Sequence, residues 1–482
     1  MDPDLRGTAP GKRPDFRVLV VGGGYVGMYT ALRLQRKLKG RLRAGTAEIV
    51  VVTPDPYMTY QPFLPEAAAG SISPRHVVVP LRRLLNLCTL VVGEVRGVDH
   101  AGRTATVTTP ATGEDGTGAK EIRYDELVLA PGSVSRTLPI PGLASCGIGF
   151  KTVEEAIGLR NHVIEQMDIA SATRDHGVRD AALTFLVVGG GYAGVEALAE
   201  LEDMARYASR YYHNIKAEDL RWILVEATGR ILPEVGEEMG AYAVRELRGR
   251  NIDVRLETRL ESCEDRIAVL SDGSRLPTRT LVWTAGVKPA PVLRATDLPL
   301  DEHGRIRCTA DLRIAGTAHA WAAGDAAAVP DLTAGPGALT APNAQHAVRQ
   351  AKVLAANLLA SLDGRPLTEY RHAYAGSVAS LGLHKGVAHV YGRRVKGYPA
   401  WLMHRVYHLS RVPTFNRKAR VLAEWILSGL FKREIVSLGS LEHPRAEFAR
   451  AAGGPGGASE PPSGGGGSDR PAPGDIPPQN PR

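Results

Sequence analysis

Two glycine clusters carry the clearest chemistry in this sequence. Gly189, Gly191 and Gly194 have the spacing of a dinucleotide-binding turn, where glycines turn the chain, admit a pyrophosphate and let a helix approach its strand. The same spacing recurs nearer the N-terminus at Gly22, Gly24 and Gly27. A helix that begins at such a turn favours phosphate, because its first N–H groups are free and its dipole is positive there. One cluster alone could serve packing, but two predict a pair of dinucleotides that exchange electrons.

The residues that follow each cluster indicate which dinucleotide it binds. Glu226 ends the strand 222–226, where a carboxylate accepts hydrogen bonds from a ribose 2′-OH and repels a 2′-phosphate. This predicts NADH rather than NADPH, although a surface glutamate at a strand end would give the same pattern. The corresponding position after the first cluster holds Thr53, with Asp55 two residues later. Either side chain could contact the ribose, and Asp55 could equally be a solvated turn residue.

Each cluster needs a buried strand before it and a helix after it. Apolar runs begin at Phe16 and Phe185, and the helical patterns that follow the turns extend to about Arg36 and about Asn214. These two βαβ units predict an α/β fold with two Rossmann-like dinucleotide-binding domains. The further strands we expect are 48–53, 90–98, 104–109, 124–132, 280–286, 320–325 and 376–391, and the further helices are 151–168 and 343–359.

The composition limits where the chain works. Its four cysteines are scattered without a CxxC pair, which argues against a zinc site, a disulfide framework and a redox dithiol, and fits a reducing cytosol. The N-terminus lacks the apolar core of a signal peptide, and no run of about 18 apolar residues could span a membrane. No nucleic-acid motif accompanies the net charge of +8. We therefore expect a soluble or peripheral protein without a bound metal.

Longer motifs point to a family. They are the two glycine clusters, YQPFLPEAAAG at 60–70, LAPGSVSRTLPIPG at 129–142, KTVEEAIGLRNHV at 151–163, RILPEVGEEMGAYAVREL at 230–247, WTAGV at 283–287, AAGDAA at 322–327 and GSVASLGLHKGVAHVYGRRVKGYPAWLMHRVYHL at 376–409. With them, residues 16–442 resemble the type II NADH dehydrogenases, single-subunit NADH:quinone oxidoreductases that pump no protons. Several of these motifs occur in all flavoprotein reductases with two dinucleotides, whereas the C-terminal motif is much more specific.

The resemblance implies FAD at the first site and NADH at the second, with hydride passing to the flavin and electrons from there to an acceptor. It implies a discontinuous FAD-binding domain at 15–147 and 302–375, interrupted by an NADH-binding domain at 148–301. A C-terminal strand with amphipathic, membrane-anchoring helices would occupy 376–442. The segments we expect to be disordered are the leader 1–14 and the Gly/Pro-rich tail 443–482.

The same resemblance assigns individual residues. Those for FAD are Gly22, Gly24 and Gly27 at the pyrophosphate, Val95 at the adenine through its backbone, and Ala130, Gly132, Asp325 and Gln345 along the rest of the cofactor, to which the strand argument adds Thr53. Those for NADH are Gly189, Gly191, Gly194 and Glu226, with Gly286 near the nicotinamide. Glu196 matches a carboxylate near nicotinamide and flavin, and we expect it to relay protons. The alternative is a first-turn glutamate that the helix dipole stabilises.

The helix 343–359 bears on the electron acceptor. In the family it carries the pattern A-Q-x-x-x-Q near the quinone and the flavin ring. This chain has Gln345 but places Arg349 where the second glutamine is expected. Gln350 follows one position later, about a hundred degrees round the helix. We therefore expect Gln345 to act at the flavin and the quinone, and Arg349 to change charge and size at the quinone entry.

Residues 392–433 hold the whole positive balance of the chain, with ten Lys or Arg and one acidic residue. The apolar residues that recur at helical spacing in this segment are Val421, Leu422, Trp425, Ile426 and Leu430. The combination predicts amphipathic helices that lie in a membrane interface and attract anionic headgroups. The interface of a homodimer, or a core-facing helix, fits the same pattern.

The resulting prediction is a peripheral FAD enzyme on the cytoplasmic face of the cell membrane, an NADH:quinone oxidoreductase of the respiratory chain. One alternative is a soluble NADH-dependent flavoprotein reductase whose acceptor is an iron–sulfur protein or oxygen, which Arg349 favours and the C-terminal motif opposes. Another is a flavin-bound, redox-responsive binding protein with low turnover. Disulfide reductases and sulfide:quinone reductases are disfavoured, because they need paired redox cysteines.

Overall fold

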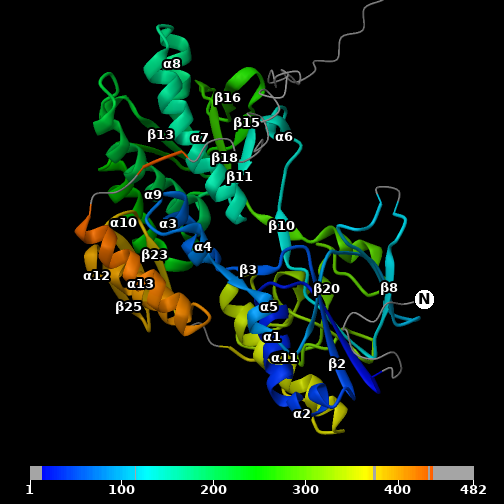
Figure 1. Cartoon of the computed structure of the whole chain (residues 1–482). Coiled ribbons are helices and arrows are strands. Elements are labelled where there is room, and N and C mark those ends of the chain that lie inside the picture. The colour runs from blue at the N-terminus through cyan, green and yellow to red at the C-terminus, as the bar shows by residue number, and fades with distance from the viewer. Residues whose placement is uncertain (1–13, 114–115, 373–375, 432–434, 438–482) are drawn as a thin grey trace, which may run out of the picture. The chain divides into compact units, whose positions relative to one another are not determined.

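The computed structural model describes residues 14–113, 116–372, 376–431 and 435–437 (Figure 1). The expected tail, and the expected leader apart from residue 14, lie outside these described residues. Within them the chain forms two parallel sheets with helices on their faces and a C-terminal group of strands and helices. The predicted α/β fold class with two Rossmann-like sheets is confirmed.

The first sheet is built around the strand that precedes the first glycine turn. Its strands, in spatial order, are β21 (Ala320–Ala322), β9 (Glu126–Leu129), β1 (Phe16–Val21), β2 (Ala47–Thr53) and β5 (Thr89–Val92), all parallel. The helices α1 (Tyr25–Lys37) and α11 (Ala344–Leu362) pack against each other beside it. The chain leaves β1 toward β2 and returns on the other side as β9. Ligands of parallel sheets bind at such a switch point, beyond the carboxyl ends of the strands.

The second sheet repeats this plan around the second glycine turn. Its parallel strands, in spatial order, are β11 (Gly147–Gly149), β18 (Thr280–Trp283), β12 (Thr184–Val188), β13 (Arg221–Val225) and β14 (Ile252–Arg255). Its helices are α7 (Val153–Ala172), α8 (His176–Ala182), α9 (Tyr192–Ala208) and α10 (Glu237–Arg248). The helix expected to reach Asn214 ends at Ala208, where a 3-10 turn follows.

Shorter elements fill the connections. The strands are β3 (Tyr57–Thr59), β4 (Val78–Pro80), β6 (Glu94–Asp99), β7 (Thr104–Thr108), β8 (Lys120–Arg123), β10 (Ser133–Ser135), β15 (Leu260–Ser262), β16 (Ile267–Leu270), β17 (Arg275–Pro277), β19 (Val287–Pro289), β20 (Ile306–Arg307) and β22 (Ala327–Ala328). The helices are α2 (Lys39–Arg43), α3 (Leu64–Ala68), α4 (Pro74–Val77), α5 (Leu81–Leu84) and α6 (Leu143–Cys146). The single strand expected at 90–98 is two strands, because Gly93 between them donates its N–H back to Thr53.

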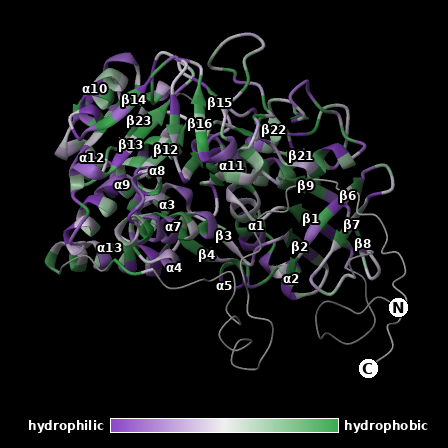
Figure 2. Ribbon diagram, turned by 90° about the horizontal axis from the view of Figure 1, so that it is seen from above, coloured by the Kyte–Doolittle hydropathy of each residue, from purple (hydrophilic) through white to green (hydrophobic). Residues whose placement is uncertain are grey.

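The C-terminal part forms the antiparallel strands β23 (Gly376–Ser380), β24 (Gly386–Val390) and β25 (Arg393–Lys396), followed by α12 (Tyr398–Arg411) and α13 (Phe415–Leu430). Its buried residues, among them Leu381, Val412 and Val421, share one apolar cluster with the helices of the second sheet and with Phe63. Phe63 belongs to the insertion 54–92, the segment rich in Pro and aromatic residues that follows β2. Figure 2 shows hydrophobic residues concentrated along the sheet strands and recurring on α13. Within the described ranges, no helix combines the length and apolar character needed to cross a bilayer.

Candidate functional site

The first glycine turn leaves room for a phosphate at the start of α1. A Cβ on Gly22, whose φ is +101°, would lie 2.2 Å from the carbonyl oxygen of Ala130, and one on Gly27 would lie 1.8 Å from that of Gly22. These two glycines therefore allow close packing. A Cβ on Gly24 would meet nothing within 4 Å. Gly24 is also the N-cap of α1, and no side chain caps this helix, so its first N–H groups are left without a capping partner. Open space beside free N–H groups at a helix start is what a pyrophosphate requires.

In the second turn, too, two glycines are closely packed and one faces open space. A Cβ on Gly189 would lie 2.6 Å from Oγ1 of Thr284, and one on Gly194 would lie 2.0 Å from the carbonyl oxygen of Gly189. Gly191, the N-cap of α9, again faces open space. Gly286, which has a φ of +95°, is similarly open and follows the neighbouring strand β18. Both turns therefore fit a dinucleotide by shape.

A cleft of about 600 Å³ opens beside the second turn, lined by Gly190, Gly191, Glu226, Thr228, Gly229, Arg230, Pro233 and Glu237. Glu226 is fixed in its wall, because its carboxylate accepts hydrogen bonds from the N–H of Gly190 (2.6 Å) and from the N–H and hydroxyl of Thr228 (2.8 Å each). A carboxylate has about four acceptor positions, so one stays available. Glu226 thus keeps an acceptor position at the wall of the cleft, and its contact with a ribose stays a prediction.

The residues assigned to FAD follow the carboxyl ends of neighbouring parallel strands. Thr53 ends β2, Ala130 follows β9, and Asp325 follows β21 in the short turn Gly324–Ala326. Thr53 is only 4% exposed, and its hydroxyl packs beneath Gly23, whereas Asp55 is exposed. The outlying strand β6 contains Val95, and Gly132 lies two residues beyond Ala130 with a φ of +74°. Their contacts with a cofactor stay predictions.

Lys151 and Ser133, which the sequence analysis did not assign to the site, lie next to Asp325. Lys151 donates to the hydroxyl of Ser133, which donates in turn to the carboxylate of Asp325, each over 2.6 Å. Lys151 precedes Thr152, the N-cap of α7, whose first turn is fixed by a reciprocal Thr152–Glu155 capping box. Burial lowers the pKa of Lys151. The only available signal was its position at the start of the KTVEEA motif.

Glu196 lies at the centre of a buried polar contact between α9 and the C-terminal part. It is the fifth residue of α9, not a first-turn residue, and only 6% exposed. One oxygen accepts a hydrogen bond from the N–H of Ser380 in β23 (2.8 Å) and lies 3.0 Å from Nε2 of His404 in α12. The angle at His404 is not that of a hydrogen bond, since its ring nitrogens have no partner among the described residues.

The burial of this pair sets its charge. Burial raises the pKa of Glu196 to about 8, although the Ser380 hydrogen bond opposes the shift. Burial, with the nearby charge of Arg405, lowers the pKa of His404 to about 3. At neutral pH a protonated carboxyl group therefore faces a neutral imidazole. A carboxyl group that holds a proton at pH 7 can act as a general acid.

A row of rings runs from Glu196 toward the first glycine turn. The rings of His404 and His408 are 4.4 Å apart, and Nδ1 of His408 lies 3.2 Å from the hydroxyl of Tyr60. Tyr60 packs edge-on against Tyr25 at 6.2 Å, in the first turn of α1. The Tyr25 hydroxyl is buried at the first nucleotide turn, with the backbone N–H of Gln61 as a neighbouring donor.

The two glutamines in the first half of α11, Gln345 and Gln350, make different contacts. Gln350 is fully buried and accepts the N–H of Gly324 (2.7 Å), so it supports the turn that carries Asp325. Gln345 donates to the carbonyl of Gly376 at the start of β23 (3.0 Å). Arg349 folds back onto the carbonyl of Gln345 (3.0 Å). Gln350 therefore does not take the place of the missing glutamine, and Arg349 keeps that position.

The apolar residues of α13 divide between two faces, one directed at the protein core and one exposed. Val421 is fully buried, and Trp425 donates to Glu66 (2.6 Å) with its ring 5.7 Å from that of Phe63. These side chains face the interior because the core of the second sheet extends under the helix. The residues left outside are Leu422, Ile426 and Leu430, with exposures of 46%, 55% and 72%.

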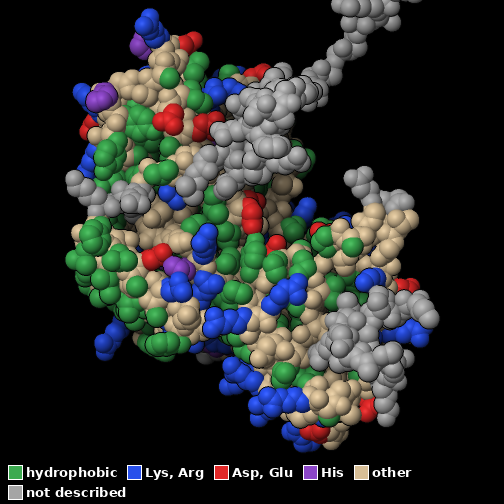
Figure 3. Space-filling view, in the orientation of Figure 1, with side chains coloured by type: hydrophobic (Ala, Val, Ile, Leu, Met, Phe, Trp, Pro, Cys, Tyr) green, Lys and Arg blue, Asp and Glu red, His purple; other side chains and the backbone are tan. Residues whose placement is uncertain are grey.

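Part of the positive charge in this segment is balanced internally. Arg394 and Lys396 pair with Glu238, and the guanidinium of Arg405 lies 3.4 Å from Glu66 and 4.2 Å from the ring centre of Trp401. The cations on α13, which are Arg417, Lys418 and Arg420, form no salt bridge with any carboxylate of the described residues. Figure 3 shows hydrophobic side chains over α12 and α13, with Lys and Arg side chains gathered beside them.

Two of the scattered cysteines meet in space. The sulfur of Cys146, at the end of α6, lies 2.8 Å from that of Cys263, which follows β15. Both are free thiols, and burial with the neighbouring sulfur raises the pKa of Cys263 to about 12. The contact joins residues 117 positions apart, so the absence of a CxxC spacing could not reveal it.

The pattern of the pyridine nucleotide-disulphide oxidoreductases matches residues 16–351, a span that includes both glycine turns. The chain belongs to this family. Among curated proteins, the type II NADH:quinone oxidoreductase of Staphylococcus epidermidis is 28% identical over 396 residues, which cover 81% of this chain and 93% of the relative. The type II NADH:quinone oxidoreductase Ndh of Mycobacterium tuberculosis is 27% identical over 449 residues, or 90% and 92% of the two chains.

A third relative and two solved structures extend the comparison. Demethylphylloquinone reductase of Synechocystis is 28% identical over 416 residues, covering 85% of this chain and 95% of its own. The structure of NDH2 from Plasmodium falciparum in complex with NADH has a TM-score of 0.79 at 16% identity, over 88% of this chain and all of that one. A ferredoxin reductase from Rhodopseudomonas palustris shares the fold at a TM-score of 0.60, with 22% identity over 78% and 82% of the two chains. The predicted resemblance to type II NADH dehydrogenases is confirmed.

Proposed function

We propose that this chain is a type II NADH dehydrogenase that passes electrons from NADH through FAD to a membrane quinone without pumping protons. The observation that carries the quinone assignment is the position of α12. One side of this helix places His404 against Glu196, and another exposes Leu402 and Val406, by 46% and 57%. A single helix therefore separates the buried site from an apolar surface, which is the side from which a lipid-soluble acceptor would approach.

The residues at the two turns fit the two cofactors. Gly24 and Gly191 leave open space where helix N–H groups can hold a pyrophosphate, and Glu226 keeps an acceptor position for a ribose hydroxyl. The Tyr25 hydroxyl and the Lys151–Ser133–Asp325 chain supply polar groups at the first turn. FAD held at the first turn would supply the chemistry of accepting a hydride from NADH and passing two electrons to the acceptor.

Glu196 supplies the proton that the overall reaction consumes. NADH, one proton and a quinone give NAD⁺ and a quinol, so each turnover takes one proton from the protein or solvent. Glu196 holds a proton at neutral pH because burial raises its pKa to about 8. The side chains of His404, His408 and Tyr60 lie in contact one after another and connect the surroundings of Glu196 with Tyr25. Gln345 and Arg349, at the start of α11, contact the quinone.

The protein works as a peripheral enzyme on the cytoplasmic face of the cell membrane. The outward residues of α12 and α13 insert into the interface, and the unpaired cations beside them bind anionic headgroups. Burying a fully exposed leucine or isoleucine contributes about 1.5–3 kcal/mol, and half-exposed side chains such as Leu422 and Ile426 contribute roughly half of that, so several together suffice for association. The same face would serve a homodimer if two copies covered it in place of lipid.

Anaerobic stopped-flow absorbance tests the proposal on the flavin-loaded protein. Flavin bleaching is followed after mixing with NADH or NADPH, and recovery is followed after mixing the reduced protein with a soluble quinone. Fast bleaching by NADH and fast recovery with quinone are the expected results. Fast bleaching with slow recovery would instead support a soluble reductase with another acceptor, and absence of bleaching would refute both.

A further inference from the structure

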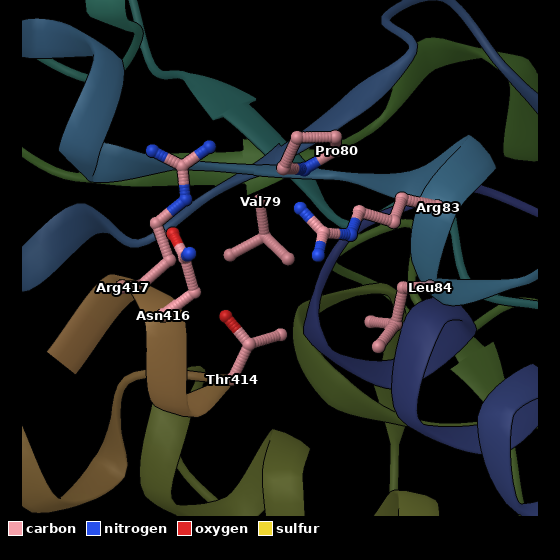
Figure 4. Close-up of a pocket in the computed structure, with 7 residues that line it drawn as sticks. All are labelled: Val79, Pro80, Arg83, Leu84, Thr414, Asn416 and Arg417. Carbon is pink, nitrogen blue, oxygen red and sulfur yellow. The ribbon is translucent and has the colours of Figure 1, made fainter. Parts of the chain in front are cut away.

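A second cavity lies beside α5, whose first residue, Leu81, packs against Gly23, and no glycine of either nucleotide turn lines it. It has a volume of about 300 Å³ and is lined by Val79, Pro80, Arg83, Leu84, Thr414, Asn416 and Arg417 (Figure 4). We call it the α5–α13 pocket, because its two walls are the segment from β4 to α5 and the start of α13. At roughly 30 Å³ per water molecule, it holds the volume of about ten waters. That is enough for a small polar group with part of its substituent.

The lining of the α5–α13 pocket is positively charged. It contains two arginines and no acidic residue. Within the described part of the chain, neither Arg83 nor Arg417 forms a salt bridge, and Arg417 donates to the backbone carbonyl of Arg75. Burial and the charges of Arg420 and Arg83 lower the pKa of Arg417. Two cations that repel each other across one cavity are stabilised by an anion placed between them.

The uncharged lining residues add hydrogen-bond donors. Thr414 has a hydroxyl group and Asn416 a side-chain amide, and Figure 4 shows the Arg83 guanidinium and the Thr414 hydroxyl directed into the cavity from opposite walls. Thr414 is also the N-cap of α13 and makes no side-chain cap, so the dipole of this helix adds to the positive potential. Guanidinium forks with nearby hydroxyl and amide donors match the oxygens of a phosphate group.

The surroundings of the α5–α13 pocket identify which phosphate it would take. Phe415 lies in sequence between the lining residues Thr414 and Asn416, and its side chain is 85% exposed. The outward row of Leu422, Ile426 and Leu430 continues along the same helix. An anion in the pocket thus lies at the margin of an exposed apolar face. A phospholipid offers both parts, since its phosphate is joined through glycerol to its fatty-acyl chains.

We propose that the α5–α13 pocket binds the phosphate of an anionic phospholipid headgroup and thereby fixes how α13 lies on the membrane. This inference rests on the peripheral membrane association proposed above. It differs from general attraction to a charged surface, because a built site distinguishes a phosphate from another anion of equal charge. It also assigns a membrane role to Arg83, which lies more than 300 residues before the basic segment 392–433.

Vesicle flotation with the flavin-loaded full chain tests the pocket. Vesicles of the uncharged, phosphate-free lipid digalactosyldiacylglycerol receive either phosphatidylglycerol or a fatty acid carboxylate, adjusted to the same surface potential. The variants are R83Q and R417Q, and the matched control is R393Q, which removes an exposed positive charge from β25. NADH-driven flavin bleaching in solution should be equal in all four proteins, because none of these arginines lies at a nucleotide turn.

We expect the natural chain to prefer phosphatidylglycerol vesicles, and R83Q to lose that preference with binding weaker by about tenfold or more, as for the loss of a charge-assisted hydrogen bond. R393Q should lose about fivefold or less on both vesicle types and keep the preference. Equal vesicle binding and equal lipid preference in R83Q and R393Q would refute phosphate binding in the pocket, but not membrane association. Failure of the natural chain to bind any vesicle would overturn both.

A second measurement separates lipid from free phosphate. Inorganic phosphate is added to the natural chain and to R83Q without vesicles, and thermal midpoints are compared with sodium chloride at equal ionic strength. If phosphate stabilises only the natural chain while R83Q keeps its vesicle preference, the pocket binds a soluble phosphate and the lipid assignment is wrong. Loss of the vesicle preference in R83Q, with or without a phosphate effect, supports the lipid headgroup.

Discussion

The buried carboxyl group of Glu196 predicts how quinone reduction depends on pH. With a pKa of about 8, roughly nine in ten of these groups carry a proton at pH 7 and roughly one in ten at pH 9. Reoxidation of the reduced flavin by quinone should therefore slow by about tenfold between these pH values. In E196Q the donor is absent, so reoxidation should fall by about 10²- to 10⁴-fold and lose this pH dependence. Bleaching by NADH should change little.

The substitution is well matched to the structure. The amide oxygen of a glutamine can still accept the Ser380 N–H, so E196Q should fold. The control is E200Q, which neutralises the next buried acidic group on α9, one turn away, where Glu200 accepts a hydrogen bond from the Ser380 hydroxyl. Stopped-flow records both half-reactions from pH 6 to pH 9. A flat reoxidation rate in the natural chain, or equal losses in E196Q and E200Q, would refute the assignment of Glu196 as proton donor.

The same pKa shift affects stability, and its sign can be worked out. The pKa of Glu196 is raised from 4.5 to about 8, so the folded protein keeps a proton that the unfolded chain releases across that range. Its contribution is fully present below pH 4.5 and is lost as pH rises through 8. The loss is on the order of 5 kcal/mol, at about 1.4 kcal/mol per pH unit. E196Q cannot ionise, so from pH 5.5 to pH 8.5 its thermal midpoint should fall less than that of the natural chain.

Five further substitutions separate the other roles. E226Q removes the charge that repels a 2′-phosphate, so the NADH over NADPH preference in kcat/KM should fall by about tenfold. R349Q should change flavin reoxidation by quinone but not bleaching by NADH, both read by stopped-flow. Q350A leaves a buried backbone N–H without its acceptor and should cost about 1–3 kcal/mol in urea unfolding. I426D, on the outward face, should release the folded protein from anionic vesicles, whereas V421D, at a fully buried position, should lose structure by circular dichroism.

The glycine turns were predictable from sequence because their constraint is local. A turn that needs open space at Gly24 and close packing at Gly27 shows this within a few residues, and the strands before and after it are continuous apolar runs. The insertion at 54–92 was not predictable in the same way. Its helices α3 and α4 have five and four residues and contain Pro65 and Pro74 in their first turns, too short for a helical period to appear.

The contacts around Glu196 could not be predicted from local sequence patterns either. Ser380 lies 184 residues away in the chain, and His404 lies on a helix that follows the strand of Ser380. Family resemblance indicated Glu196 itself, but only the fold shows that C-terminal residues close over it. The closure has a physical consequence, because it removes water from the carboxyl group and so raises its pKa. The proton site is thus a product of tertiary packing.

The pattern on α13 shows why a hydrophobic stripe alone does not identify what covers it. Val421 and Leu422 are neighbours, as are Trp425 and Ile426, so the apolar residues form two adjacent rows rather than one. A stripe that only had to cover the protein core could be narrower, since one row of about 100° suffices for a surface helix. The first row meets the core and the second is left exposed. Because only one of the two apolar rows of α13 meets the protein core, the other row needs a second apolar environment, and beside the two arginines of the α5–α13 pocket we propose that this environment is lipid.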